Sequence, residues 1–217
     1  MRVGIAGYGV VGKTRHRSIE SNTSYQVTAI SESSEKARKS IPEGITVYND
    51  YKTLIASAEL DVIFISLPNQ FAAEAACLSL QNGLHVFCEK PPARTHAELL
   101  EVEKQSLKFP ELKLMYGFNH RFHLSVEEAK LLIDSNSLGR LINMKGVYGK
   151  SQMISFNQTD WRTDREASGG GILLDQGIHM LDLMRYLSGE NFTDVFSIID
   201  NAFWNFDVED NAYVLMK

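Results

Sequence analysis

Three glycines near the N-terminus constrain the fold of this chain more than any other feature. Gly7, Gly9 and Gly12 follow the short apolar segment Arg2–Ala6 and open a segment with helical character that runs to about Ser21. The spacing fits G-x-G-x-x-G, in which the first glycine makes a tight turn, the second lets the backbone approach a pyrophosphate and the third lets helix and strand pack closely. The N-terminus of such a helix offers N–H groups and the positive end of a dipole to a phosphate. The residues predicted to bind a dinucleotide here are Gly7, Tyr8, Gly9, Val10, Val11 and Gly12.

The same turn fits a second phosphate-binding pattern. Residues Gly7–Thr14 satisfy G-x-x-x-x-G-K-[ST], the phosphate loop of nucleoside triphosphatases. Such an enzyme needs an acidic residue at the end of a later apolar strand to hold Mg²⁺, and the apolar segment Val62–Leu67 ends without one. Glu32, 20 positions after Gly12, instead fits a carboxylate that binds a ribose 2′-hydroxyl. The dinucleotide interpretation is therefore favoured over the triphosphatase and over a plain glycine turn.

Glu32 also bears on the choice between NAD and NADP. A carboxylate at this position repels a 2′-phosphate, which favours NAD. Ser33, Ser34, Lys36 and Arg38 lie nearby in the sequence and could accept a phosphate, so NADP stays possible. The alternative for Glu32 is an ordinary solvated side chain on the surface.

The first half of the chain alternates strands with helices. The predicted strands are Arg2–Ala6, Val27–Ile30, Thr46–Tyr48, Val62–Leu67, His85–Cys88 and Lys113–Phe118. Further helices are predicted over Glu35–Ser40, Asp50–Ser57, Phe71–Gln81 and Thr95–Lys108. Asp50 and Thr95 are the expected N-caps, with Glu98 completing a capping box. This alternation predicts right-handed crossovers and a mostly parallel sheet.

The second half has a different pattern. Helices are predicted over Val126–Ser135 and Ile172–Leu187, strands over Leu141–Tyr148, Val195–Asp200 and Ala212–Met216, and an irregular polar loop over Ser151–Asp164. We expect a domain boundary near residues 118–124. The last residues keep strand character up to Lys217 without a turn or cap, so we also expect the chain to be shorter than the fold that it encodes.

Two groups of polar residues follow predicted strands of the first half. Leu67, Pro68 and Asn69 follow the fourth strand, and Glu89 and Lys90 follow the fifth. Ligands of an open parallel sheet bind beyond the carboxyl ends of its strands, so both groups are expected at the cofactor. The proline after Lys90 could form a cis peptide bond and fix the direction of the ammonium group. Lys90 is a candidate for proton transfer, and the alternative is an ordinary surface lysine.

A third group lies in the predicted helix after Gly169–Gly171. Asp175, His179 and Asp182 are spaced i, i+4, i+7, which places them on one helix face. Two acids and an imidazole suit acid–base chemistry, since histidine titrates near neutrality. The alternative is the solvated face of an amphipathic helix.

Taken together, these motifs resemble those of the Gfo/Idh/MocA family of NAD(P)-dependent oxidoreductases. The matching segments are Gly7–Gly12, Pro68–Asn69, Cys88–Pro91 with Ala93 and Thr95, Asn119–Phe122, Trp161–Arg162 and Gly169–Asp182. The resemblance implies an N-terminal Rossmann domain over residues 1–120. It also implies an α/β domain for substrate binding and oligomerisation over residues 121–217, with an open, mainly antiparallel sheet that would be incomplete here.

The resemblance also implies roles for individual residues. Lys90, Asp175 and His179 would form the catalytic group, with Lys90 and His179 relaying the proton of a substrate hydroxyl and Asp175 orienting the sugar or the imidazole. Hydride would pass between the nicotinamide and a hydroxyl or keto carbon of a sugar, polyol or nucleotide-linked sugar. Asn119, Arg121 and Arg162 would line the substrate pocket. The chain departs from the family at Ala72, where a histidine is frequent, and at Leu67, where threonine or serine is frequent.

Composition excludes several other classes of protein. Among 217 residues, 22 basic and 27 acidic side chains give a net charge of -5 without a long basic run, so nucleic acid is not expected as a partner. No apolar run reaches the ~18 residues of a membrane helix, and the N-terminus does not read as a signal peptide. Cys77 and Cys88 lack metal-like spacing, so we expect no metal and a reduced, cytoplasmic protein.

Two expectations concern partners. An open sheet in the second domain needs its exposed face covered, which predicts a homo-oligomer formed through that sheet. A non-catalytic sensor or assembly protein that binds a dinucleotide with the same fold is the alternative to the enzyme.

Overall fold

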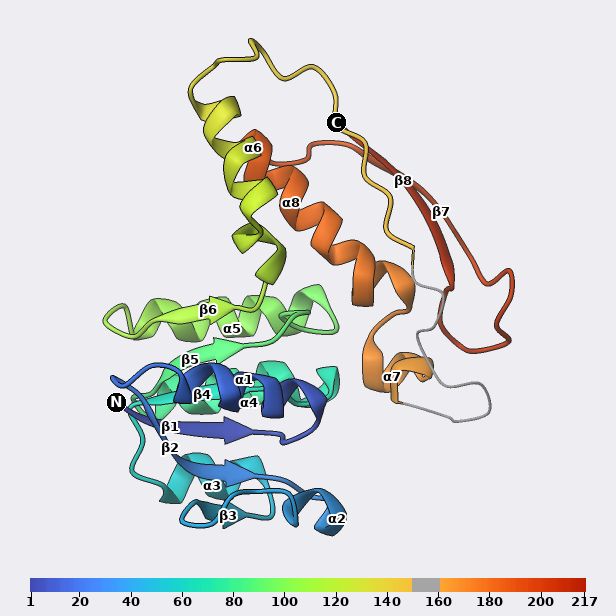
Figure 1. Cartoon of the computed structure of the whole chain (residues 1–217). Helices are drawn as coiled ribbons and strands as arrows, with labels where there is room; N and C mark the ends of the chain where they lie inside the picture. The colour runs from blue at the N-terminus through green and yellow to red at the C-terminus, as the bar shows by residue number, and fades with distance from the viewer. Residues whose placement is uncertain (150–160) are drawn as a thin grey trace. The chain divides into compact units, whose positions relative to one another are not determined.

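The computed structural model describes residues 1–149 and 161–217, which form two compact units, Met1–Gly117 and Phe118–Lys217 (Figure 1). The first unit is a six-stranded parallel sheet in the order β3-β2-β1-β4-β5-β6. Its strands are β1 Arg2–Ala6, β2 Gln26–Ser31, β3 Thr46–Tyr48, β4 Val62–Ile65, β5 His85–Cys88 and β6 Leu114–Tyr116. The strand order changes direction at β1 and β4, which is the switch point where open sheets of this kind bind ligands. The predicted parallel α/β domain is confirmed.

Helices connect these strands and begin where the sequence supplies caps. They are α1 Val10–Glu20, α2 Glu35–Arg38, α3 Tyr51–Ser57, α4 Asn69–Gln81 and α5 His96–Lys108. The Asp50 carboxylate accepts the Thr53 N–H at 2.8 Å, and the Thr95 hydroxyl accepts the Glu98 N–H at 3.2 Å, so both predicted N-caps are confirmed. The Glu98 carboxylate accepts a backbone hydrogen bond from Thr95, as the predicted capping box requires, and it also binds the backbone N–H and guanidinium of Arg94.

The core of the first unit lies on both faces of the sheet. Val3, Ile5, Ile30, Ile63 and Ile65 on the central strands are almost completely buried. Burial on both faces explains why these strands are continuously apolar in the sequence. This packing fixes the carboxyl ends of β1, β2, β4 and β5, from which the predicted cofactor residues project.

The second unit contains two longer helices and an antiparallel hairpin (Figure 1). The helices are α6 Leu124–Asp134 and α8 Ile178–Ser188, and the hairpin strands are β7 Val195–Asp200 and β8 Asn211–Met216. Short helical segments are η1 Asn119–Phe122, η2 Trp161–Thr163, α7 Arg165–Ser168 and the π-helical η3 Leu173–Gly177. Among the described residues, the antiparallel sheet of this unit consists of β7 and β8.

Two predictions for the second unit were wrong in detail. The alternating segment Leu141–Tyr148 forms no strand, and its Ile142 side chain is 93% exposed. A strand needs a neighbour to pair its backbone groups, and no described strand pairs with this segment. The helix predicted over Ile172–Leu187 starts with the π-helical turn η3 rather than with α-helical spacing. Most of the loop predicted over Ser151–Asp164 lies outside the described residues.

One face of the hairpin carries apolar side chains. Phe196 pairs with Leu215 and Ile198 pairs with Tyr213, and these four side chains are 70–72% exposed.

No helix among the described residues is long and apolar enough to cross a membrane.

Candidate functional site

The glycine turn between β1 and α1 needs glycine at two positions for its own geometry. Gly7 has φ +88°, and a Cβ there would lie 2.5 Å from the carbonyl oxygen of Ser66 on the neighbouring chain segment. A Cβ on Gly12 would lie 2.1 Å from the carbonyl oxygen of Gly7. A Cβ on Gly9, in contrast, would meet no atom within 4 Å. Gly9 therefore borders open space, which suits close approach of a ligand to the backbone.

The turn leads into the N-terminus of α1, which is suited to an anion. Gly9 is the N-cap and supplies no side-chain hydrogen bond to the first turn, and that turn contains no acidic residue. The first N–H groups of an α-helix have no intrahelical partner, so they and the helix dipole favour a phosphate. The backbone of this chain therefore fits the pyrophosphate of a dinucleotide.

Glu32 is bound to the glycine turn and is not a solvated surface acid. One of its carboxylate oxygens accepts the Tyr8 N–H at 2.9 Å, and the other accepts the Ser34 N–H at 2.8 Å. Each oxygen keeps a further lone-pair site, so the carboxylate can still accept hydrogen bonds from ribose hydroxyls. Arg38 donates to the backbone oxygens of Glu32 and Ser33, each at 2.9 Å, which fixes the end of β2. This geometry supports the predicted ribose role.

Glu89 and Lys90 follow β5, and the peptide bond between Lys90 and Pro91 is cis, one of the two isomers that the sequence allows at this proline. The Glu89 carboxylate accepts a 2.5 Å hydrogen bond from Nε of Arg15 on α1. The Arg15 guanidinium lies 5.0 Å from the centre of the Phe87 ring. On the other side, a Cβ on Gly117 would lie 2.7 Å from Oε2 of Glu89. The structure thus holds Glu89 between α1 and the end of β6, a relationship that sequence reasoning missed.

The residues after β4 form the start of α4. Pro68 is its N-cap residue and Asn69 is buried at its first position. Leu67 is half-buried and packs against the hydrophobic core, and Ala72 is 4% exposed within that core. The two departures from the family pattern are therefore apolar side chains that join the core.

The π-helical turn η3 carries Asp175, and α8 continues it with His179. Gln176 donates a 2.7 Å hydrogen bond to the Asp175 carboxylate, and His179 is 5% exposed. Asp175 lies in the wide π turn and precedes the first α-helical residue of α8. The α-helical geometry that the i, i+4 prediction assumes therefore does not hold between Asp175 and His179. Single π turns inside helices occur frequently at functional sites.

Asp182, the third residue predicted to lie on the helix face of Asp175 and His179, forms a bidentate ion pair with Arg121. Nε of Arg121 lies 2.8 Å from one oxygen of Asp182, and a guanidinium NH₂ group contacts the other. The hydrogen bond to Asp182 raises the pKa of Arg121 above its ordinary value. The pair joins η1 to α8, so Arg121 has a structural partner in addition to its predicted role in the substrate pocket.

Aromatic rings surround His179. The His120 and His179 rings are stacked, with centroids 4.1 Å apart and an interplanar angle of 11°. Tyr148 stacks on His120 at 5.8 Å and 16°, and Phe118 meets His179 edge-on at 6.3 Å and 89°. Sequence reasoning identified neither His120 nor Tyr148, although His120 lies inside the quoted segment Asn119–Phe122. His120 reaches His179 because η1 packs against α8, and Tyr148 reaches His179 from the irregular segment Leu141–Tyr148.

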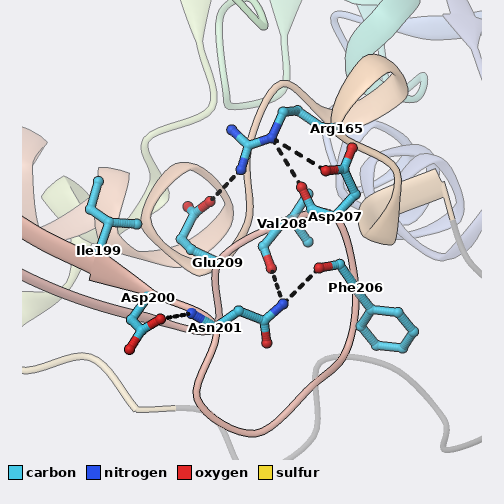
Figure 2. Close-up of a pocket in the computed structure, with 8 residues that line it drawn as sticks. All are labelled: Arg165, Ile199, Asp200, Asn201, Phe206, Asp207, Val208 and Glu209. Carbon is cyan, nitrogen blue, oxygen red and sulfur yellow. Dashed lines mark hydrogen bonds and ion pairs between the residues drawn. The ribbon is translucent and has the colours of Figure 1, made fainter.

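The loop between β7 and β8 is bound to the segment that precedes Asp175. The backbone oxygen of Glu209 accepts the Ile172 N–H at 2.9 Å, and its buried carboxylate accepts the Leu173 N–H at 3.3 Å. A Cβ on Gly171 would lie 1.9 Å from the Glu209 backbone oxygen, which explains the glycine. Figure 2 shows Arg165 beside the Glu209 carboxylate. Nε of Arg165 also donates a 3.0 Å hydrogen bond to the backbone oxygen of Asp207.

The remaining predicted residues lie in both units. Asn119 is exposed in η1, and the Arg162 guanidinium lies 4.3 Å from the Trp161 ring centre. Lys90 belongs to the first unit, whereas Asp175 and His179 belong to the second, so their action as one catalytic group stays a prediction.

Among residues 1–149 and 161–217, no group of three His, Cys, Asp or Glu side chains could hold a metal ion. Burial raises the pKa of the Cys88 thiol, which is fully buried.

Comparison with family models matches both halves of the chain. Residues 1–116 match the oxidoreductase family with an NAD-binding Rossmann fold, and residues 126–217 match the GFO/IDH/MocA C-terminal domain. Among curated proteins, D-glucoside 3-dehydrogenase of Escherichia coli is 30% identical over 200 residues, covering 87% of this chain and 54% of that protein. Levoglucosan dehydrogenase of Pseudarthrobacter phenanthrenivorans is 32% identical over 143 residues, covering 65% of this chain and 36% of that protein.

Solved structures show the same fold. Myo-inositol 2-dehydrogenase of Lactobacillus plantarum has a TM-score of 0.89 at 26% identity and covers 100% of this chain. Levoglucosan dehydrogenase in complex with NADH and levoglucosan has a TM-score of 0.89 at 25% identity. The chain spans 66% and 63% of these two structures and about half the length of the Escherichia coli relative.

Proposed function

The chain belongs to the Gfo/Idh/MocA family of oxidoreductases, and we propose on this basis that it is an NAD(P)-dependent dehydrogenase or reductase. It would transfer hydride between the nicotinamide and a hydroxyl or keto carbon of a sugar, polyol or nucleotide-linked sugar. The observation that carries the proposal is the binding of Glu32 to the backbone of the glycine turn. That contact brings the Glu32 carboxylate, which would bind the ribose, next to the helix N-terminus that would bind the phosphates.

Residues of the first unit would bind the cofactor. The backbone at Gly9 and the first N–H groups of α1 would hold the pyrophosphate, and Glu32 would accept a ribose hydroxyl and disfavour a 2′-phosphate. The nicotinamide half of the cofactor would contact the residues that follow β4 and β5, which are Leu67, Pro68, Asn69, Glu89 and Lys90. When bound, NAD supplies the redox chemistry, because its nicotinamide accepts or donates the hydride.

Residues from both units would transfer the proton of the substrate hydroxyl. In the oxidative direction Lys90 and His179 would relay the single proton of the substrate hydroxyl away from the reacting carbon, while bound NAD would take up the hydride. In the reductive direction the same residues return that proton to the new hydroxyl. Asp175 would orient the sugar or the imidazole. The protein thus contributes position and proton transfer to the reaction.

The names of the relatives support the substrate class. D-glucoside 3-dehydrogenase, levoglucosan dehydrogenase and myo-inositol 2-dehydrogenase are named for substrates with many hydroxyl groups. Asn119, Arg121 and Arg162 would contact such a substrate, since amide and guanidinium donors suit oxygen-rich molecules.

The test is turnover of NAD(H), followed by NADH absorbance across a panel of glucosides, levoglucosan, inositols and UDP-sugars. Lys90→Ala and His179→Ala should each lower kcat by ~10²–10⁴-fold, the usual contribution of a general acid–base group. Unchanged kcat in both variants would show that the catalytic residues are misassigned. Tight NAD binding without turnover of any panel member would instead favour the non-catalytic dinucleotide sensor.

We also propose that the apolar face of the hairpin packs against a second copy of the chain. Phe196, Ile198, Tyr213 and Leu215 lie on one face and are 70–72% exposed. A contiguous apolar surface of this kind is typical of an interface. Light scattering after size exclusion should show an oligomer, and Ile198→Glu should convert it to a monomer. A wild-type monomer would contradict the proposal.

A further inference from the structure

We propose that His120 is a positioning residue that holds the imidazole of His179 in the orientation required for proton exchange. The inference rests on the proposed function, because it takes His179 as an acid–base residue. Its basis is the parallel stacking of the two rings, 4.1 Å between centroids and 11° between planes. This is the closest ring contact described for His179.

Two further aromatic rings contact His120. Tyr148 stacks on His120 at 5.8 Å and on His179 at 6.2 Å, so it lies beside both imidazoles, and His123 meets His120 edge-on at 5.3 Å and 90°. Its neighbour in sequence, Arg121, is fixed to α8 by the bidentate ion pair with Asp182, three residues after His179. The ion pair therefore joins η1 to α8 beside the position where the His120 ring covers His179.

The edge of Phe118 restrains the same imidazole from a second direction, at 6.3 Å and 89°. The terminal torsion of a histidine has broad wells, so burial alone does not fix which way the ring nitrogens point. A flat ring stacked on one side and an aromatic edge on another block rotation of the His179 ring. Fixed orientation matters because a misplacement of about 1 Å in a catalytic group costs ~10²-fold in rate.

The test compares His120→Ala, which removes the ring, with His120→Phe, which keeps a flat ring without its nitrogens. His120→Ala should lower kcat by ~10–10²-fold, while KM for NADH changes little. His120→Phe should restore kcat to within about threefold of wild type, well inside that loss. His96→Ala is the matched control, because His96 is exposed in the first turn of α5 in the other unit. Wild-type kcat in His120→Ala, or a His120→Phe variant as slow as His120→Ala, would overturn the proposal.

A second measurement does not depend on turnover. The ring protons of His179 should show an NMR ring-current shift from His120 that is lost in His120→Ala and kept in His120→Phe. Absence of this shift in the wild type would overturn the proposal even if the enzyme is active. If the wild type turned over no panel substrate while the shift was present, the proposed function would fail and the positioning of His179 by His120 would stand.

Discussion

The backbone N–H of Tyr8 donates a 2.9 Å hydrogen bond to the carboxylate of Glu32, so the residue predicted to select the cofactor also holds the turn that is predicted to bind it. Removing the carboxylate in Glu32→Ala should weaken NADH binding by ~10-fold or more, since a hydrogen bond to a charged group contributes ~1.5–3 kcal/mol. It should also raise the affinity for NADPH relative to NADH, because repulsion of the 2′-phosphate is lost. Calorimetric titration with both dinucleotides measures the two effects.

The control for this prediction is Glu35→Ala, which removes an exposed carboxylate from α2 close in sequence. It should leave both affinities unchanged. An unaltered ratio of NADPH to NADH affinity in Glu32→Ala would refute the ribose role of Glu32.

Glu89 offers a test of cofactor positioning from two sides. Gly117→Ala would place a Cβ 2.7 Å from the Glu89 carboxylate. The Glu89 side chain moves more easily than the backbone at residue 117, so the carboxylate should be displaced. Arg15→Met would remove the 2.5 Å hydrogen bond from the opposite side. Both variants should weaken NADH binding by about 3–10-fold, the equivalent of one ordinary hydrogen bond, as measured by NADH fluorescence titration. Arg17→Met on the exposed face of α1 should have no effect, and wild-type affinity in both test variants would exclude a role for Glu89 at the cofactor.

Much of the fold follows from local sequence signals. The apolar run at β4, the glycine turn and the caps Asp50 and Thr95 depend on neighbours within a few residues, so they are visible in the sequence. The contact between Arg15 and Glu89 joins residues 74 positions apart, and the stack of His120 on His179 joins η1 to a helix far along the chain. Such pairs follow from how elements pack, which residue spacing does not encode.

The π turn at Asp175 was missed for a related reason. A period of 3.6 residues predicts a regular helix, whereas the observed start of this helix is shaped by contacts with the β7–β8 loop. The strand predicted from the alternating pattern of Leu141–Tyr148 is absent, because no described strand pairs with the backbone of this segment. Local pattern predicts the type of an element only where its surroundings agree.

Gly171 and Gly170 form a matched pair for testing the support of η3. In Gly171→Ala the new Cβ would lie 1.9 Å from the Glu209 backbone oxygen, so the loop or the helix start must shift. In Gly170→Ala the nearest atom is Cβ of Leu174 at 3.3 Å, which requires only a small adjustment. Gly171→Ala should lower the free energy of unfolding by about 1–3 kcal/mol, the range for overpacked sites, and Gly170→Ala by clearly less. Equal stability of the two variants in urea unfolding would contradict this assignment.

Asp210 should make the stability of the second unit depend on pH. Burial opposes ionisation of this carboxyl, but hydrogen bonds from the backbone N–H groups of Trp204, Ala202 and Phe203 outweigh it and lower its pKa below the ordinary value of 3.8. A carboxyl with a lowered pKa in the folded state stabilises that state above its unfolded pKa, and this contribution is lost as pH falls through the folded value.

Asp210→Asn should therefore lower the free energy of unfolding by about 1–2 kcal/mol at pH 7, and the difference from wild type should shrink below about pH 4. The amide keeps one acceptor oxygen but turns its NH₂ group toward backbone donors, so it cannot replace both carboxylate oxygens. Urea unfolding followed by tryptophan fluorescence reports on this unit, because the two tryptophans, Trp161 and Trp204, both lie in it. Asp207→Asn is the control, because the Asp207 side chain is 76% exposed and its carboxylate lies 3.9 Å from Arg165. A difference between wild type and Asp210→Asn that is the same at pH 7 and pH 3 would show that the ionised carboxylate does not hold the loop.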